Sequence, residues 1–322
     1  MAYRIPLPDG GRLADLDILE PNSTAVQRFI RRQGLGAYER STAATVLALC
    51  ELHDPGFVFF DIGANMGLYG ALAGSMFAPR MVHAFEPAPT AAAVAGRIMA
   101  KNRLSAEVFE MAVSDETGSA ALHLSPVSDA SNSLVEGFRD TTDQVEVATI
   151  RLDDHVARTG LSPDIIKIDV ETHEPAVLRG ARATIESSRP AIVIEVLRRR
   201  GLDHGKEITT LMEEFGYFYY ELPESPVWEA RSAISGSGTT DRDWLLLPDQ
   251  LAPSFPAAWE RWNRRLIECG PDRNPRAPII PTVRAALDRG GWREVIAAGR
   301  RHLASTRDEP TDDEPIRDGR SS

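Results

Sequence analysis

Hydrophobic residues along this chain form short continuous runs that alternate with helical patterns. The first run, residues 57–60, is entirely apolar, as expected of a strand that is buried on both faces of a parallel sheet. A glycine turn follows, and the apolar residues from Met66 onward suit a helix that packs back onto the sheet. Further strands are expected at residues 81–85, 107–113, 164–170, 190–196, 217–221 and 243–247. This order predicts an α/β fold with a doubly wound, mostly parallel, seven-stranded sheet.

The segments outside this sheet are expected to be loops and helices. Residues 1–23 are predicted to be a loop because prolines and glycines interrupt them. Helices are expected at residues 24–33, 39–52, 90–102, 175–187, 206–215, 251–270 and 281–304. The predicted organisation is a helical cap at 1–55, a cofactor-binding domain at 56–250, a helical extension at 251–305 and a disordered tail at 306–322.

Residues 118–150 alternate between apolar and polar positions on both sides of a polar loop, a pattern that predicts a β-ribbon over the ligand crevice. Asn132 and Ser133 in that loop either touch a ligand or only complete the loop. His123 on the ribbon is expected to be structural. Trp259 and Trp262, in the predicted helix at 251–270, are interpreted as core anchors in preference to a sugar-binding platform.

Composition narrows the functional class. The chain has 322 residues, 43% of them hydrophobic, which is enough for a full core, and a net charge of −11, which argues against a nucleic-acid substrate. Because it has no apolar run of about 18 residues, a membrane span is not expected. The first residues lack the pattern of a signal peptide, and Cys50 and Cys269 are well separated. We therefore expect a cytoplasmic protein with two reduced thiols.

The turn after the first strand contains the main chemical signal. It begins at Asp61, and the stretch reads D-x-G-x-N-x-G through Gly63, Asn65 and Gly67. A dinucleotide fingerprint needs a second glycine where Asn65 stands, which argues against an NAD-dependent oxidoreductase. The pattern resembles the first motif of S-adenosylmethionine (SAM) methyltransferases. There, the turn and the helix N-terminus face the methionine carboxylate, an anion that suits the positive end of a helix dipole.

Acidic residues follow the next two strands. Glu86, before Pro87, lies 23 positions after Gly63 and is placed to accept hydrogen bonds from both ribose hydroxyls, or to cap the next helix. Asp115, after Ser114, follows the third predicted strand. It either accepts a hydrogen bond from the adenine amino group or belongs to a plain turn.

Titratable residues gather at the end of the fourth predicted strand. Lys167 lies inside it and must find a carboxylate or reach solvent. Asp169, Glu171 and His173 follow at the carboxyl end, where open α/β sheets bind ligands. Asp169 or His173 is the predicted acceptor of a substrate proton, with His173 alternatively making only a cap or loop hydrogen bond.

Five sequence blocks together resemble the FkbM-family SAM-dependent methyltransferases. They are DIGANMGLYG (61–70), AFEPAP (84–89), LDD (152–154), KIDVETHEPAVLRGA (167–181) and RPAIVIEV (189–196). The resemblance covers roughly residues 56–200, and it implies a class I Rossmann-like fold and O-methylation of sugars or natural products. It also implies that Asp169 and Glu171 flank the transferring methyl group. The predicted cofactor contacts are Asp61, Gly63, Ala64, Asn65, Gly67, Glu86, Pro87, Ser114, Asp115 and Asp169. Thr172 departs from the family, in which glycine is common at this position.

The predicted function is therefore SAM-dependent methyl transfer to a hydroxyl of a small molecule, in which the acidic and histidine cluster assists deprotonation. The alternative is a non-catalytic protein that binds SAM or a nucleotide. Carboxylate clusters also bind divalent cations, but the sequence has no metal-specific spacing, so a metal stays open. The oligomeric state is also open, with the surface of residues 253–269 as a candidate homodimer contact.

Overall fold

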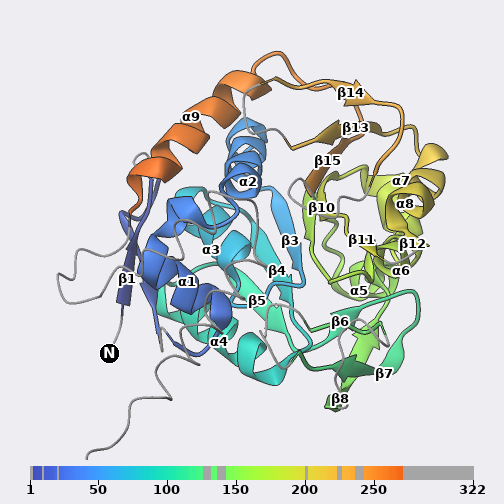
Figure 1. Ribbon diagram of the computed structural model, residues 1–322, viewed down its shortest axis with the longest axis horizontal. Helices are drawn as coiled ribbons and strands as arrows, with labels where there is room; N and C mark the ends of the chain where they lie inside the picture. Colours follow the sequence, from blue (N-terminus) through green and yellow to red (C-terminus); the bar gives the residue numbers. More distant parts are fainter. Residues whose placement is uncertain are drawn as a thin grey trace, which may run out of the picture. The chain divides into compact units, whose positions relative to one another are not determined.

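Eight strands form the central sheet (Figure 1). In spatial order they are β14 (Ala230–Arg231), β13 (Phe218–Glu221), β15 (Asp243–Leu247), β10 (Ala191–Glu195), β9 (Ile165–Ile168), β3 (Val58–Ile62), β4 (Met81–Phe85) and β5 (Ala106–Phe109). The neighbouring strands β5, β4, β3, β9 and β10 are parallel to one another. Strand β15 lies between β10 and β13 and runs antiparallel to both. This order confirms the expected class I methyltransferase topology, with the two-residue β14 as an eighth strand.

This computed structural model describes residues 3–8, 11–19, 22–125, 132–135, 143–199, 202–222, 227–235 and 243–270. All of them belong to the first of two units, residues 1–277; the second unit is residues 278–322. The predicted helix at 281–304 and the predicted tail at 306–322 lie outside the described residues, as does most of the loop at 125–143. The division into four segments stays a prediction.

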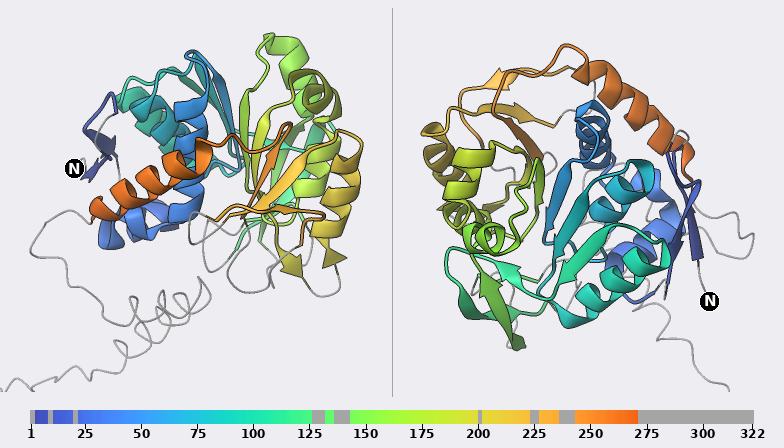
Figure 2. Two further views of the ribbon diagram at one scale, coloured as in Figure 1. Left: turned by 90° about the horizontal axis from the view of Figure 1, so that it is seen from above. Right: turned by 180° about the vertical axis from the view of Figure 1, so that it is seen from behind.

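Helices cover both faces of the sheet (Figure 2). On one face α2 (Arg40–Leu52), α3 (Leu68–Met76) and α4 (Pro89–Lys101) contact the strands, and α1 (Ala25–Gln33) and the short η1 (Leu35–Ala37) precede α2. The other face packs against α5 (Leu152–Thr159), α6 (Glu174–Arg179), α7 (Arg182–Ser188) and α8 (His204–Glu213). A two-stranded sheet of β11 (Arg198–Arg199) and β12 (Leu202–Asp203) precedes α8.

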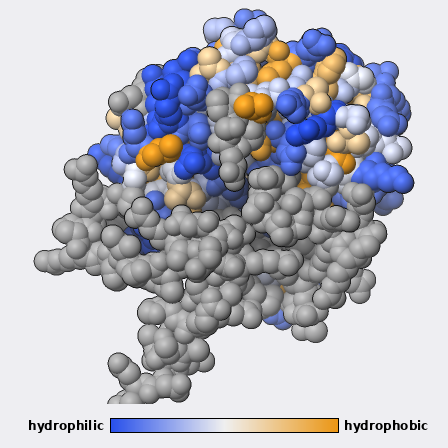
Figure 3. Space-filling view, turned by 45° about the horizontal axis from the view of Figure 1, so that its top comes forward, coloured by the Kyte–Doolittle hydropathy of each residue, from blue (hydrophilic) through white to orange (hydrophobic). Residues whose placement is uncertain are grey.

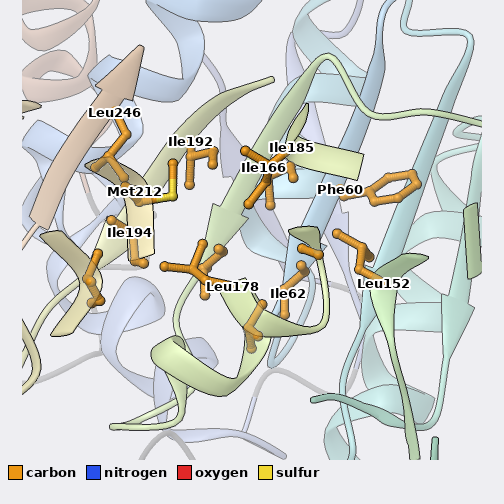
Figure 4. Packing of buried hydrophobic residues seen from close by; sticks show 14 of the residues in the cluster. Phe60, Ile62, Leu152, Ile166, Leu178, Ile185, Ile192, Ile194, Met212 and Leu246 are labelled. Atoms are coloured by element: carbon orange, nitrogen blue, oxygen red, sulfur yellow. The ribbon is translucent and has the colours of Figure 1, made fainter. Parts of the chain in front are cut away.

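The core on this second face consists of branched aliphatic side chains from the central strands and apolar residues from the helices. Figure 4 shows Ile166, Ile192 and Ile194 packed together with Leu178 of α6 and Met212 of α8. These strand residues are at most 1% exposed. In a parallel sheet that is buried on both faces, ligands bind at the carboxyl ends of the strands, which is where the candidate site lies.

Three predictions about secondary structure were wrong. Residues 1–23 contain a hairpin of β1 (Tyr3–Pro6) and β2 (Asp15–Ile18), whose alternating side chains bury Leu16 and Ile18. The predicted helix at 175–187 is two helices that break near Gly180. A Cβ there would lie 2.0 Å from the carbonyl oxygen of Ser114, so the close approach of these two backbones requires glycine.

The third wrong prediction concerns the strand at 107–113. In the structure β5 ends at Phe109, and β6 (Ala112–Val113) then joins a separate sheet with β7 (Gly118–His123) and β8 (Gln144–Ile150). This second sheet confirms the predicted ribbon. Ser114 and Asp115 thus follow a strand of the small sheet, not the third strand of the central one.

Helix α9 (Phe255–Glu268) packs on α2 through its tryptophans. Trp259 and Trp262 are 1% and 3% exposed and donate hydrogen bonds to the Ser41 carbonyl and the Glu51 carboxylate, which confirms their role as core anchors. Figure 3 shows small hydrophobic patches separated by hydrophilic residues on the coloured part of its face. Within the described residues, no helix is both long enough and apolar enough to span a bilayer.

Candidate active site

The turn between β3 and α3 has a left-handed backbone. Gly63, Asn65 and Gly67 have φ angles of 79°, 49° and 76°, in a region that favours glycine and tolerates asparagine. At Gly63 a side chain has no room, because an added Cβ would lie 1.8 Å from the carbonyl oxygen of Asp169. The turn therefore lies directly against the end of β9, where the sequence predicts the reacting groups.

Asp61 braces this turn from within the sheet. Its side chain is buried, and Oδ2 accepts a hydrogen bond from the backbone N–H of Gly70 at 2.9 Å. Burial raises the pKa of Asp61 to about 6, and the hydrogen bond from Gly70 opposes this shift. Asp61 therefore joins β3 to α3, and its predicted contact with a cofactor stays a prediction.

Glu86 ties the ends of β3 and β4 together. Its Oε2 accepts a hydrogen bond from the Asn65 N–H at 2.7 Å, and its Oε1 accepts one from the Ala88 N–H at 2.8 Å. The N–H groups of Gly63 and Ala64 both donate to the Phe85 carbonyl, so the turn is also held through backbone bonds. The N-cap residue of α4 is Ala88, and this helix start has no side-chain cap hydrogen bond, so the second interpretation, in which Glu86 is the helix cap, was wrong. The ribose contact and the role of Pro87 stay predictions.

Lys167 lies at the centre of a group of acidic side chains. It is 1% exposed, its Nζ lies 3.2 Å from Asp169 Oδ2, and it lies 5.2 Å from the centre of the Tyr69 ring. Burial alone would lower the pKa of Lys167, but the surrounding carboxylates raise it above its usual value. These carboxylates belong to Asp169, Asp243, Glu39 and Glu195. Lys167 is therefore charged, and the expectation that it finds a carboxylate is confirmed.

Two of these carboxylates come from parts of the chain that the sequence did not indicate. Glu39 precedes α2 and accepts a hydrogen bond from the Tyr69 hydroxyl at 2.6 Å. Asp243 opens β15 and accepts one from the Thr42 hydroxyl at 2.5 Å. Neither residue stands in a motif. In the sequence Asp243 was visible only as the first residue of a predicted strand, and Glu39 only as the first residue of a predicted helix.

The segment after β9 is strained. Glu171 and Thr172 have φ angles of 52° and 80°, which side chains with a Cβ rarely adopt. The Glu174 carboxylate stabilises this segment, since Oε1 accepts from the Thr172 N–H at 3.0 Å, and the Ser133 hydroxyl donates to the Glu171 carbonyl at 2.7 Å. Burial raises the pKa of Glu174 to about 7. The backbone at Thr172 thus has the conformation for which glycine is suited, which explains why threonine there is a departure.

His173 contacts the other side of the predicted site. Its Nε2 lies 2.9 Å from the Ser114 hydroxyl, which also donates to Asp115 at 3.2 Å. Asp115 pairs with Arg179 at 2.9 Å. Burial and Arg179 lower the pKa of His173, against the opposing effect of Asp115. The structure therefore brings His173 together with Ser114 and Asp115, which were predicted to bind the cofactor.

Three carboxylates could hold a divalent cation. One oxygen from each of Asp169, Glu171 and Glu195 lies within 4.8 Å of the others among the described residues. Oxygen ligands of this kind suit magnesium or calcium. The Lys167 ammonium lies against Asp169 and would repel such an ion. The metal therefore stays open.

Most residues of this site lie in a part of the chain that matches a known protein family. A family model described as the methyltransferase FkbM domain matches residues 61–219, which include the glycine turn, Glu86 and the segment around Lys167. This part of the chain is therefore similar to the FkbM methyltransferase family. Its resemblance to that family, predicted from five short blocks, is thereby confirmed.

One characterised relative is 31-O-demethyl-FK506 methyltransferase FkbM of Streptomyces tacrolimicus. It is 31% identical over an alignment that covers 39% of this chain and 60% of that protein. The chain thus spans less than two thirds of that relative's length.

Among solved structures, a methyltransferase FkbM from Methylobacillus flagellatus is 15% identical. The match covers 63% of this chain and 47% of that protein, with a TM-score of 0.39. Aeropyrum pernix fibrillarin, solved with bound SAM, is 14% identical, with 77% and 99% coverage and a TM-score of 0.40.

Proposed function

We propose that this protein is a SAM-dependent O-methyltransferase of the FkbM family that acts on a hydroxyl of a sugar or natural product. The observation that carries the proposal is the contact between the glycine turn and the acidic strand end: Gly63 lies against the Asp169 backbone, so a cofactor held by the turn would face Asp169. The name of the Streptomyces tacrolimicus relative, a methyltransferase for an O-demethyl compound, also supports an oxygen acceptor.

The residues around the turn fit SAM. Helix α3 starts at Gly67 without a side-chain cap, so its N-terminus suits the carboxylate of the methionine moiety. Glu86 is buried at the end of β4, where it would accept hydrogen bonds from the ribose. We place Asp61, Gly63, Ala64, Asn65 and Pro87 around the same moieties, and Ser114 and Asp115 near the adenine. When bound, SAM supplies a methyl group: the new C–O bond forms as the C–S bond breaks, and that electron pair stays on sulfur.

The acidic residues would prepare the acceptor. A hydroxyl is a poor nucleophile until its proton leaves, and a carboxylate within about 3 Å orients it and weakens its O–H bond. Asp169, whose charge is balanced by Lys167 at 3.2 Å, is the residue we assign to this orientation, with Glu171 beside it. His173 is less suited to accept the proton because its Nε2 is engaged by Ser114.

The experiment is a search for methyl transfer from isotope-labelled SAM to a panel of hydroxylated sugars and secondary metabolites, read by product mass. Wild type is compared with Asp169→Asn and His173→Ala. We expect Asp169→Asn to lower kcat about 10²–10⁴-fold and His173→Ala to have a much smaller effect.

Wild-type turnover in both variants would show that the cluster is not catalytic. SAM binding without any methylated product would favour the non-catalytic binding protein. The same assay with EDTA tests whether turnover requires a divalent cation, because unchanged turnover would show that it does not.

A further inference from the structure

Glu39 lies outside the family domain, yet its carboxylate belongs to the charged group at the end of β9. We propose that Glu39 is a catalytic residue of this enzyme, the group that takes the proton from the acceptor hydroxyl. This inference rests on the proposed function and adds a residue that the FkbM domain, residues 61–219, does not contain.

The position of Glu39 is fixed by its neighbours. Its carboxylate accepts a hydrogen bond from the Tyr69 hydroxyl at 2.6 Å and a second from the hydroxyl of Tyr38. Its backbone has φ 37° and ψ 48°, a left-handed conformation that is unfavourable for a residue with a side chain. The Ala43 N–H donates to the Glu39 carbonyl at 2.9 Å, so the first turn of α2 holds this conformation.

Charged and titratable groups from every adjoining element face Glu39. They are Tyr38 beside it, Tyr69 of α3, Lys167 of β9, Asp169 after β9 and Asp243 of β15. The pKa of Glu39 is raised to about 7, mainly by burial and also by Asp169 and Asp243, against the lowering effect of Lys167 and the Tyr69 hydrogen bond. A general base is most effective when its pKa lies near the working pH, and Glu39 meets this condition.

Glu39 and Asp169 differ in their partners, which separates their roles. Asp169 is paired with the Lys167 ammonium, so protonating it would break an ion pair. Glu39 accepts hydrogen bonds from neutral phenol groups, so taking a proton weakens its attraction to the Lys167 charge but breaks no direct ion pair such as the one that Asp169 makes. In the step we infer, the acceptor O–H bond breaks and its proton joins a Glu39 oxygen. The electron pair of that bond forms the new bond from oxygen to the methyl carbon.

A consequence can be measured without knowing the acceptor. A base that reaches the acceptor oxygen lies within a few ångströms of the methyl donor, whose sulfonium is positive, whereas the sulfur of S-adenosylhomocysteine is neutral. The positive charge lowers the pKa of Glu39, so binding of SAM releases a proton and binding of the product does not. At pH 7, with a pKa of about 7, the expected release is about half a proton per SAM bound.

The test is calorimetric titration of each nucleoside into the full chain at pH 7, in buffers with different ionisation enthalpies. Wild type is compared with Glu39→Gln and with the control Glu51→Gln. Glu51 lies on the same helix, where it binds Arg261 and Trp262. We expect all three proteins to bind SAM, and wild type and Glu51→Gln to release the proton. Glu39→Gln should lose this release. The pKa values of Asp61 and Glu174 are also raised, but both residues are present in all three proteins, so any proton that they release cancels in the comparison.

Equal proton release from wild type and Glu39→Gln would overturn the inference. If wild type bound neither nucleoside, the proposed function itself would fail, and this result is distinct from the first. Tyr69→Phe provides a second variant in case Glu39→Gln folds poorly. It removes a hydrogen bond that lowers the pKa of Glu39, so the midpoint of the proton release should move to higher pH. An unchanged midpoint would contradict the assignment.

Once an acceptor has been found, turnover gives an independent measure. Glu39→Gln should lower kcat about 10²–10⁴-fold and leave the dissociation constant for SAM nearly unchanged, while Glu51→Gln keeps wild-type kcat. Wild-type kcat in Glu39→Gln would exclude Glu39 as the base. A residue that acted only through packing would change the melting temperature without changing proton release.

Discussion

The two halves of the candidate site are built in different ways. The cofactor half consists of the turn at residues 61–67 and Glu86, and its polar groups are held by backbone N–H groups of neighbouring residues. The acceptor half consists of Glu39, Lys167, Asp169, Glu195 and Asp243, which come from four separate segments and interact chiefly through their charges. The cofactor half therefore depends on backbone geometry, and the acceptor half depends on a balance of charge.

This difference bears on specificity. The whole cofactor half lies within the family domain, whereas Glu39 and Asp243 lie on either side of it. Segments outside the family domain thus complete the charged group beside which we place the acceptor. Substitutions in the cofactor half should act on folding and SAM affinity, and substitutions in the acceptor half should act on protonation and turnover.

The largest expected loss of stability is at Gly63, where the neighbouring backbone leaves no room for a side chain. Gly63→Ala places a Cβ against the Asp169 carbonyl in a left-handed conformation, and we expect a loss of about 3 kcal/mol of unfolding free energy. Gly56→Ala is the matched control, because Gly56 has φ 84° with nothing within 4 Å of an added Cβ, and it should cost about 1 kcal/mol. Denaturant unfolding measures both. Equal losses would show that the close contact at Gly63 is unimportant.

The pH dependence of the unfolding free energy should have opposite signs at His155, which contacts His83 of β4, and at Glu39 in the acceptor half. His155 is buried, with Nε2 2.9 Å from His83 Nδ1 and with Arg158 nearby. Burial, His83 and Arg158 lower its pKa from 6.5 to about 4. Between these values the unfolded chain binds more protons, so this contribution to stability is lost as pH falls from about 6.5 to 4. Glu39 has the opposite sign, since its raised pKa favours the folded state as pH falls below about 7.

Comparing wild type with His155→Phe isolates the histidine contribution, because both proteins contain the same carboxyl groups. We expect wild type to lose roughly 2–3 kcal/mol more than the variant between pH 6.5 and 4. Unfolding measured across this range checks the difference. Parallel pH profiles would contradict a neutral, buried His155.

Glu86→Ala tests the cofactor half through a ligand. The substitution removes the acceptor of the Asn65 and Ala88 N–H groups together with the expected ribose contact. We expect SAM binding to weaken by about 1–3 kcal/mol, the cost of leaving hydrogen-bonding groups without partners. Glu186→Ala, at an exposed glutamate on α7, is the control and should leave the affinity unchanged. If both variants bound SAM equally well, Glu86 would not belong to the cofactor site.

The smallest effect is expected at Arg179, which bridges Asp115 and Glu207 at partly exposed positions. Ion pairs of this kind contribute about 1 kcal/mol or less. Arg179→Ala should therefore change the unfolding free energy by less than about 1 kcal/mol. A loss of several kcal/mol of unfolding free energy would mean that this network, which includes His173 and Ser114, is important for the stability of the fold.

The contrast between the two halves also explains what the sequence could predict. The glycine turn and most strands could be predicted because their signals are local: an apolar run, a glycine turn and an acidic strand end follow one another. Glu39 and Asp243 could not be assigned, since they approach Lys167 only when β15 inserts beside β10 and the start of α2 packs over the sheet. The pairing of His173 with Ser114 was missed for a related reason. The third strand ends at Phe109, and Ser114 follows a separate small sheet.

The central claim is that the glycine turn and Glu86 hold SAM. Calorimetric titration of wild type with SAM, S-adenosylhomocysteine and NADH tests it most directly. We predict micromolar binding of the first two and no heat of binding with NADH, because Asn65 stands where a dinucleotide site needs glycine. Absence of SAM binding, or equal binding of NADH, would contradict the account.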